Sequence, residues 1–466
     1  MNMQNENSSI LPVREKVSYA LGDFACCLIW QSISVYLLYY FTNVAGVPTA
    51  DAVRIISISK ILDGITDILM GFVIDRTKSR FGKVRPYILT MGLPLGLSTI
   101  LLFSVPSGLS IGGKLIWIFV CYNLVTTVFY TALNVPYSSF HCFLTDDSDE
   151  RARLSNIRLV FAYAAQVLIN GSVFFLVRKL GGGELADQNG WTKAFLIIGI
   201  ACFLLTLVTF FGTKERVSGE SSGSGRPSVT ILDSLRSVGQ NKYLLMILAT
   251  SLCSFMQSAI GMGAAAYFAQ FILKNVDATG SITNAQSIAQ VLTLIFVTPV
   301  LLRHFKKHTL YQASTILMII SFFGSALAPD KLPLILAMNA LKGIAFAGTT
   351  TMIYGMCADA IDYGEWKTGI NSAGLGTAMM QGLGKFGMGI GTYILGLILD
   401  FGGFEASAAV QTASGEAALI GCYTWIPGIF LVVTFLIMLA YHLDREYPAI
   451  IRELNKRRGR EQFHLY

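Results

Sequence analysis

The chain has 466 residues, of which 53% are hydrophobic and only 14% charged, and its mean hydropathy is +0.57. A soluble globular domain usually carries about 25% charged residues, so this composition excludes an ordinary soluble protein and is typical of a chain that lies in lipid. The formal net charge of +7 comes from basic residues in short loops and in the C-terminal tail. That placement indicates membrane orientation rather than a nucleic-acid partner.

Twelve apolar windows follow one another along the chain, each long enough to cross a bilayer as a helix. A hydrocarbon core about 30 Å thick needs about 20 apolar residues per helical span. The windows lie at roughly 17–42, 51–75, 86–106, 114–138, 154–178, 192–212, 243–274, 284–302, 309–328, 333–359, 372–400 and 417–442. Because the short alternating strands of a membrane barrel are absent from the pattern, we expect an all-α membrane protein with twelve transmembrane helices.

The twelve windows divide into two groups of six around a Gly/Ser-rich segment, SGESSGSGRPS, whose composition is typical of a flexible linker. Two six-helix halves joined in this way resemble the major facilitator fold, in which pseudo-symmetric halves rock around a site at the membrane midplane. We expect an N-terminal segment, an N-terminal half, a linker, a C-terminal half and a tail at 1–16, 17–213, 214–242, 243–442 and 443–466.

Basic loop residues predict the orientation of the chain. The loop after the second window holds Arg76, Lys78, Arg80, Lys83 and Arg85, whereas the loops NVAGVPTAD and FGGFEASAAVQTASGE contain no Lys or Arg. Since Lys and Arg concentrate in cytoplasmic loops, we expect this basic loop, the linker and both termini in the cytoplasm, with the chain in the plasma (inner) membrane. The polar N-terminal segment lacks the apolar core of a cleavable signal peptide.

Three charged residues fall inside the second window. Lys60, Asp63 and Asp67 stand at positions i, i+3 and i+7, so a helix presents them on one face. A charge at the bilayer centre costs at least about 2.5 kcal/mol, and two acids there require a wet cavity, a partner or a bound cation. We expect Asp63 and Asp67 to form a cation site whose charge Lys60 balances. In the alternative interpretation, Lys60 reaches toward the interface and simply pairs with Asp63.

Carboxylate oxygens suit a hard cation such as sodium or lithium. Thr66 in the same turn, or Thr131 in the fourth window, is expected to complete the ligand shell. Because like charges one turn apart raise the proton affinity of at least one acid, a proton is the alternative coupling ion. No other cofactor is expected.

Lys385 is a second costly charge, in the eleventh window. It needs a partner at membrane depth, and we expect Asp63 or Asp67 of the other half, because an amine facing these acids neutralises them when no ion is bound. The alternative places Lys385 in a cytoplasm-facing cavity as an accident of packing. Arg158 in the fifth window has a similar status, nearer the predicted cytoplasmic end.

Polar and aromatic residues of the first and fourth windows are candidates for binding a solute. Asp23 lies in the first window, and Tyr130 and Asn134 precede Pro136, whose missing amide favours a kink toward a cavity. Aromatic rings stack on sugar faces and an amide can bind hydroxyls, although the same residues also suit contacts between helices.

The segment GFVIDRTKSRFGK follows the two acids at the predicted cytoplasmic end of the second window. Its glycine permits close helix approach, and its charges can pair across the junction with the third window or its neighbours. We expect it to latch an outward-facing state; positive charge that only sets orientation is the alternative. The candidate gate residues in this segment are Gly71, Asp75, Arg76, Arg80 and Lys83.

Over nearly its whole length the chain resembles the glycoside-pentoside-hexuronide:cation symporter family of the major facilitator superfamily, and is similar to its melibiose-transporting members. The resemblance rests on separated motifs in the right order: KVSYALGDF, ILDGITDILMGFVIDRTKSRFGKVRPY, LNVPYSSF, DAIDYGEWKTG and GKFGMGIG. It implies secondary active symport, by alternating access, of a cation with a sugar, glycoside or glucuronide-like solute. It also implies a gate role for Tyr363 and Glu365 in the fourth motif.

The family's cation machinery matches this chain residue by residue. By resemblance, Asp63 and Asp67 fall on the cation-site acids, Thr131 on a threonine that assists sodium binding, and Lys385 on a charged lysine of the eleventh span. Thr66 occupies an asparagine position of the family.

The family's sugar site matches less well. Arg158 matches an arginine near the sugar, and Asn134 stands where a sugar-binding aspartate occurs, but Cys27 occupies the position of the family's first-span aspartate and Ser138 that of a tryptophan. A thiol is a poor acceptor for sugar hydroxyls. We therefore expect a less polar glycoside, a glucuronide or a modified sugar in place of melibiose, with Arg158 leaving room for an anionic substituent.

Two other classes of function are weighed against this one. A membrane enzyme is disfavoured because the sequence lacks a His-rich metal pattern, a nucleophile-base pair and a phosphate loop. A sensor, or a carrier of lipid or another amphipathic solute on the same fold, stays an alternative. We expect a transporter and not an enzyme, whose partners are a small solute, a monovalent cation and the bilayer, with no nucleic acid; the chain is expected to be monomeric.

Overall fold

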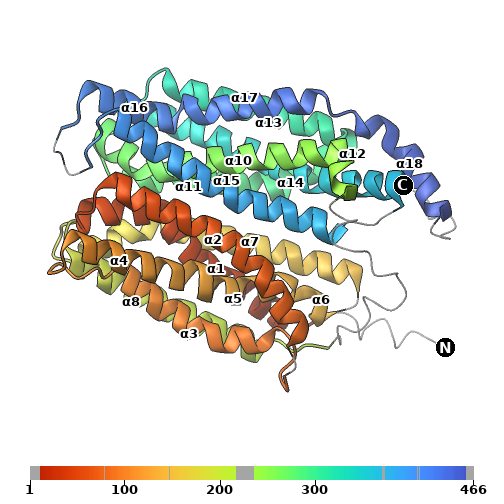
Figure 1. Cartoon of the computed structure of the whole chain (residues 1–466), viewed down its shortest axis with the longest axis horizontal. Helices are drawn as coiled ribbons and strands as arrows, with labels where there is room; N and C mark the ends of the chain where they lie inside the picture. The colour runs from red at the N-terminus through yellow and green to blue at the C-terminus, as the bar shows by residue number, and fades with distance from the viewer. Residues whose placement is uncertain are drawn as a thin grey trace.

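The computed structural model describes residues 11–77, 79–145, 147–216, 236–369, 373–406, 408 and 410–457. These residues form long helices and no strand, stacked in two bundles that lie one above the other in Figure 1. The N-terminal bundle contains α1 (Val13–Tyr39) with the π-helical turn η2 (Tyr40–Val44), α2 (Thr49–Arg76), α3 (Arg85–Leu102), α4 (Ile111–Asn123) continued by η3 (Leu124–Tyr130) and α5 (Thr131–Ser139), α6 (His141–Leu144), α7 (Ser148–Leu180) and α8 (Gln188–Gly212).

The C-terminal bundle repeats this plan. It contains α10 (Lys242–Tyr267) with η4 (Phe268–Ile272), α11 (Ala278–Leu292) with η5 (Thr293–Val297) and α12 (Thr298–His304), α13 (Lys307–Ala326), α14 (Leu332–Thr368), α15 (Ala373–Phe401), α16 (Ala413–Tyr423), α17 (Trp425–Leu439) and α18 (Leu443–Arg457). The predicted linker lies mostly outside the described residues, as do the chain ends 1–10 and 458–466.

Helices stand at all twelve predicted windows. Within the described residues, 11 continuous helical runs are long and apolar enough to cross a membrane. The helix at the remaining window, α2, has 28 residues and is long enough to span a membrane. It is less apolar than the other eleven because Lys60, Asp63 and Asp67 interrupt its apolar run. The prediction of an all-α membrane protein is confirmed.

The tenth helix extends further than hydropathy predicts. α14 has 37 residues and continues past the predicted window end at 359 to Thr368, where Gly369 ends it with a left-handed φ of 73°. Its last turns are polar and pack against α18: Tyr447 donates a 2.9 Å hydrogen bond to Asp362, and the indole of Trp366 donates one of 2.8 Å to Glu453. Packing on a neighbouring helix, rather than lipid, therefore supports this part of α14.

The two bundles meet closely at one end. The hydroxyls of Thr42 and Tyr267 lie 2.6 Å apart, and Arg178 pairs with Asp277 at 2.5 Å. At Gly280 of α11 there is no room for a Cβ, because the carbonyl of Asn170 on α7 occupies that space. Small residues let helices approach closely in membranes, so this end is held shut by direct contact.

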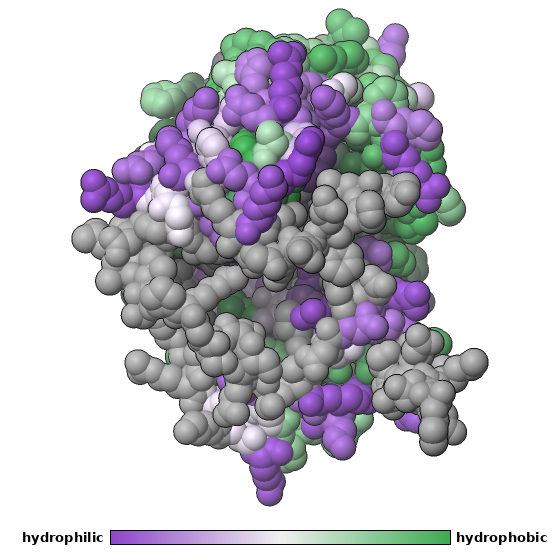
Figure 2. All heavy atoms as spheres, turned by 90° about the vertical axis from the view of Figure 1, so that its right-hand side faces the viewer, coloured by the Kyte–Doolittle hydropathy of each residue, from purple (hydrophilic) through white to green (hydrophobic). Residues whose placement is uncertain are grey.

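The opposite end, which carries α6 and α18, differs. Figure 2 shows that hydrophilic residues gather over this end and that its surface is recessed between the two bundles. Two ion pairs at this end each join residues of the same bundle: Lys16 with Glu150 at 2.5 Å in the N-terminal bundle, and Lys307 with Asp359 at 2.7 Å in the C-terminal bundle. The structure is thus closed at one end and parted at the end predicted to be cytoplasmic.

Candidate cation and solute site

The two acids of α2 face hydroxyls of the fourth span. Oδ1 of Asp63 accepts hydrogen bonds from the hydroxyls of Thr126 at 3.0 Å and Thr127 at 2.5 Å. Oδ1 of Asp67 accepts one of 2.8 Å from Thr131. The acids and Thr131, predicted as neighbours, are therefore brought together, and oxygen atoms of the kind that hard cations prefer converge there.

The π-helical turn η3 explains how three threonines reach two carboxylates. Thr126 and Thr127 lie within it and Thr131 directly follows it. A wider turn inside an α-helix re-aims side chains and is frequent at functional sites. The prediction missed Thr126 and Thr127; of the two, only Thr127 stands four residues before Thr131, the spacing that puts two residues on one face of a regular helix.

Thr66 makes no hydrogen bond to the two carboxylates within the described residues. Its hydroxyl donates to backbone carbonyls of its own helix, at 3.1 Å to Asp63 and 3.3 Å to Leu62. Hydroxyls commonly bond this way inside helices, and the oxygen of Thr66 keeps its lone pairs, so its role as a cation ligand stays a prediction.

A lysine of the other bundle reaches the acids. The amine of Lys385 on α15 forms an ion pair with Oδ2 of Asp67, and the side chains are 22% and 28% exposed. Asp63 is 2% exposed. Lys385 thus contacts one of its two expected partners, and both side chains remain partly exposed.

Lys60 does not pair with Asp63 within the described part of the chain. Its amine lies 5.2 Å from the ring centroid of Trp30, and that ring stacks on Tyr130 with centroids 5.4 Å apart. A cation over an indole face is attracted by the ring quadrupole. Lys60 therefore connects the cation site to aromatic residues of the first and fourth spans.

Arg158 and Asp23 form a second charged group. Nε of Arg158 lies 3.5 Å from Oδ2 of Asp23, and both side chains are mostly buried. Cys27 is half-buried one turn further along α1, and Asn134 is half-buried on α5. Outside the spans, burial and the charge of Arg158 lower the pKa of His141. A guanidinium has five N–H donors, so Arg158 retains donors beyond its contact with Asp23 and the group is a candidate for binding a polar solute.

The predicted gate residues are spread over the parted end. Arg80 stacks on the ring of Phe81 at 4.6 Å, and the backbone amide of Lys83 donates to Glu215 at 2.8 Å. Tyr363 packs edge-on against Tyr243, with centroids 4.9 Å apart, while Glu365 lies in the last turns of α14. The side chains of three further gate candidates lie outside the described part of the structure: Gly71, Asp75 and Arg76.

Comparison with known proteins agrees with the fold. Residues 18–445 match the family described as MFS/sugar transport protein. The chain is 29% identical over 458 residues to the isoprimeverose transporter of Lactiplantibacillus pentosus, covering 98% of this chain and 94% of that protein. It is 29% identical over 454 residues to the putative glycoside/cation symporter YagG of Escherichia coli (strain K12), covering 96% of each.

A solved structure of the nucleoside transporter NupG aligns with a TM-score of 0.62 at 14% sequence identity, covering 92% of this chain and 100% of that one. At this identity the likeness concerns the fold alone. It agrees with the major facilitator architecture, while the family match and the two relatives confirm the resemblance to glycoside-pentoside-hexuronide:cation symporters. The chain belongs to the MFS/sugar transport protein family and is an integral membrane transporter, not an enzyme.

Proposed function

We propose that this transporter couples the movement of a monovalent cation, sodium, to the uptake of a sugar-like solute. The cation binds at the carboxylates of Asp63 and Asp67 with the hydroxyls of Thr127 and Thr131, and the solute binds beside Arg158. The two ligands are linked because each favours the arrangement of the halves that the other needs.

The observation that carries this proposal is the ion pair between Asp67 and Lys385, which belong to different bundles. A sodium ion and the lysine amine compete for the same carboxylate. When the cation binds, the amine is released, and a contact between the halves is lost at the same time. Cation binding is thereby converted into a change in how the halves fit together, which is the requirement for coupled alternating access.

The solute side of the proposal rests on Arg158 and its surroundings. A guanidinium offers several donors in a fixed plane and suits hydroxyls and anionic groups of a sugar derivative. The names of the two relatives, an isoprimeverose transporter and a putative glycoside/cation symporter, favour the same class of solute. Cys27 in place of a carboxylate favours a solute with fewer hydroxyls on that side.

We place the transporter in the plasma membrane with both termini in the cytoplasm. The end closed by Thr42, Tyr267, Arg178 and Asp277 is then periplasmic or extracellular, and the parted end faces the cytoplasm. This is an inward-facing arrangement, and the segment GFVIDRTKSRFGK closes on the other bundle in the outward-facing state.

The test is uptake by cells that express the protein, with isoprimeverose as the probe and sodium replaced by choline in the control. Wild-type cells are expected to accumulate the probe above its external concentration only with sodium. Asp67→Asn should abolish accumulation while the protein remains in the membrane at wild-type level. Unchanged ion-driven accumulation in Asp67→Asn would refute the proposal.

A further inference from the structure

Lys342 is a buried basic residue that the cation site does not use. It lies in the span formed by α14, and only 5% of it is exposed. Its amine lies 4.0 Å from the ring centroid of Phe322 and 5.0 Å from that of Tyr423. Among the described residues it donates one long hydrogen bond, 3.4 Å, to Oδ1 of Asn339. That oxygen already accepts a 3.1 Å hydrogen bond from Tyr423.

These contacts leave the charge of Lys342 without a counter-ion. Lys385 and Lys307 each hold a carboxylate, but no ion pair within the described ranges involves Lys342. Two aromatic faces offset only part of the cost of burying an ammonium group. A lysine amine has three N–H donors, so it retains donors for a ligand. An intramembrane charge without a protein partner is a candidate functional site.

The amine opens into a cavity. A space of about 50 Å³ is lined by Lys342 and Asn339 together with the polar side chains of Gln257, Thr283 and Gln286. Amide and hydroxyl groups around a single ammonium supply further donors at short range, an arrangement that matches an anionic group with several oxygen atoms. An apolar ligand would leave these donors unpaired.

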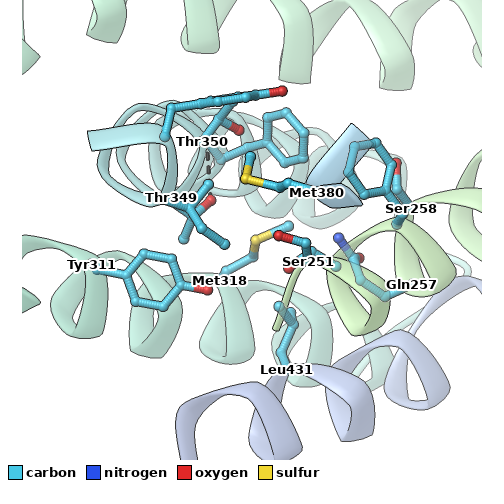
Figure 3. Close-up of a pocket in the computed structure, with 14 residues that line it drawn as sticks. Ser251, Gln257, Ser258, Tyr311, Met318, Thr349, Thr350, Met380 and Leu431 are labelled. Carbon is cyan, nitrogen blue, oxygen red and sulfur yellow. Dashed lines mark hydrogen bonds between the residues drawn. The ribbon is translucent and has the colours of Figure 1, made fainter. Parts of the chain in front are cut away.

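This small space adjoins a larger one. A cavity of about 230 Å³ shares four lining residues with it, Gln257, Ser258, Met318 and Phe346. Figure 3 shows the larger cavity, with Gln257 and Ser258 of α10 at one side and Tyr311 of α13 at the other. Its lining combines hydroxyl groups with apolar side chains and therefore suits the body of a sugar derivative.

The region around Lys342 meets the N-terminal bundle. The neighbouring Gly343 packs against the backbone of Gln290, and Gln290 donates a 2.7 Å hydrogen bond to the hydroxyl of Tyr163 on α7. Arg158 lies on the same helix, five residues before Tyr163, so an extended solute held by Arg158 can reach toward this junction. Tyr354, which lines the larger cavity, is 51% exposed.

We propose that Lys342 binds the oxyanion of an acidic sugar, a carboxylate or a sulfonate, whose body occupies the larger C-terminal cavity. The inference rests on the proposed function, since it names the class of solute carried. It assigns recognition of the anionic end to the C-terminal bundle, so the solute joins Lys342 to the Arg158 group. The bound oxyanion supplies the counter-charge that Lys342 lacks among the described residues.

The test uses the full-length protein purified in detergent and three probes: 4-nitrophenyl β-D-glucuronide, its 6-sulfo counterpart and the neutral 4-nitrophenyl β-D-glucoside. Calorimetric titration is expected to show at least one acidic probe binding at least about 30-fold more tightly than the neutral one, the difference made by a buried charge pair. The stronger acidic probe identifies carboxylate or sulfonate. Lys342→Met should remove this preference and Lys342→Arg should retain it.

Lys331→Met is the matched control, because Lys331 directly precedes α14 and is exposed; it should keep the preference. Equal loss for all three probes in Lys342→Met, or no preference for an acid in the wild type, overturns the inference. If Lys342→Met does not fold, the wild type and Lys342→Arg provide the test. Absence of the preference for acidic probes in either protein is sufficient to reject the inference. If the preference for acidic probes is absent but sodium-driven accumulation of isoprimeverose persists, the proposed function holds and only the role of Lys342 is rejected.

Discussion

Replacing Lys385 by methionine should make sodium bind more tightly. The lysine amine holds Asp67 from the other bundle, with the two side chains 22% and 28% exposed. Two unit charges about 4 Å apart attract by about 4 kcal/mol at an effective dielectric constant of about 20. Screening by the solvent that reaches this pair reduces the figure to about 2 kcal/mol. Because sodium no longer competes with the amine, its affinity should rise about 30-fold.

The assay is the thermal unfolding midpoint of the purified protein as sodium replaces choline at constant ionic strength, since a ligand that binds the folded state raises this midpoint. Half-saturation should move to about 30-fold lower sodium in Lys385→Met. Lys331→Met, which removes an exposed lysine, should titrate like the wild type. Unchanged or weaker sodium binding in Lys385→Met would contradict competition between the amine and the ion.

Three further changes test separate parts of the structure. Thr127→Val removes the 2.5 Å hydrogen bond to Asp63 and should weaken sodium binding about tenfold in the same titration, with Thr127→Ser close to wild type; equal effects of both changes would argue against the hydroxyl. Arg178→Glu places a negative charge opposite Asp277 and should shift the population several-fold toward a state in which the closed end is open. Distances between spin labels on the two bundles at this end measure the shift. The double change Arg178→Glu/Asp277→Arg should restore the closed end. The carboxylate of Glu215 caps the start of α3 by accepting hydrogen bonds from three backbone amides. Glu215→Gln weakens these hydrogen bonds and should lower the free energy of unfolding by about 1 kcal/mol. An unchanged thermal unfolding midpoint would argue against this capping role.

Intramembrane charge made much of the site predictable. Asp63, Asp67 and Lys385 stand out in apolar windows because lipid penalises them, and helical spacing places the two acids on one face. The structure adds the cross-bundle ion pair, whose geometry depends on how two separately folded halves meet. The spacing of residues along one helix carries no information about how the two bundles pack against each other.

Other features escaped the sequence for identifiable reasons. Thr126 and Thr127 were missed because a π-helical turn, not a regular α-helix, aims them at Asp63, and hydroxyls are common in spans. Lys342 carries the same signal as Lys385, a charge within the predicted window 333–359, and was overlooked. The end of α14 at Thr368 lies beyond that window because contacts with α18, rather than hydropathy, maintain the helix there.

The most direct test of coupling is the flux of radioactive sodium into proteoliposomes, measured with and without isoprimeverose outside. Sodium entry should rise when the sugar is present in the wild type and stay at the level of protein-free liposomes in Asp67→Asn, whatever the sugar concentration. Sodium entry that ignores the sugar in the wild type, or sugar-stimulated entry that survives in Asp67→Asn, would contradict a coupling ion held between Asp63 and Asp67.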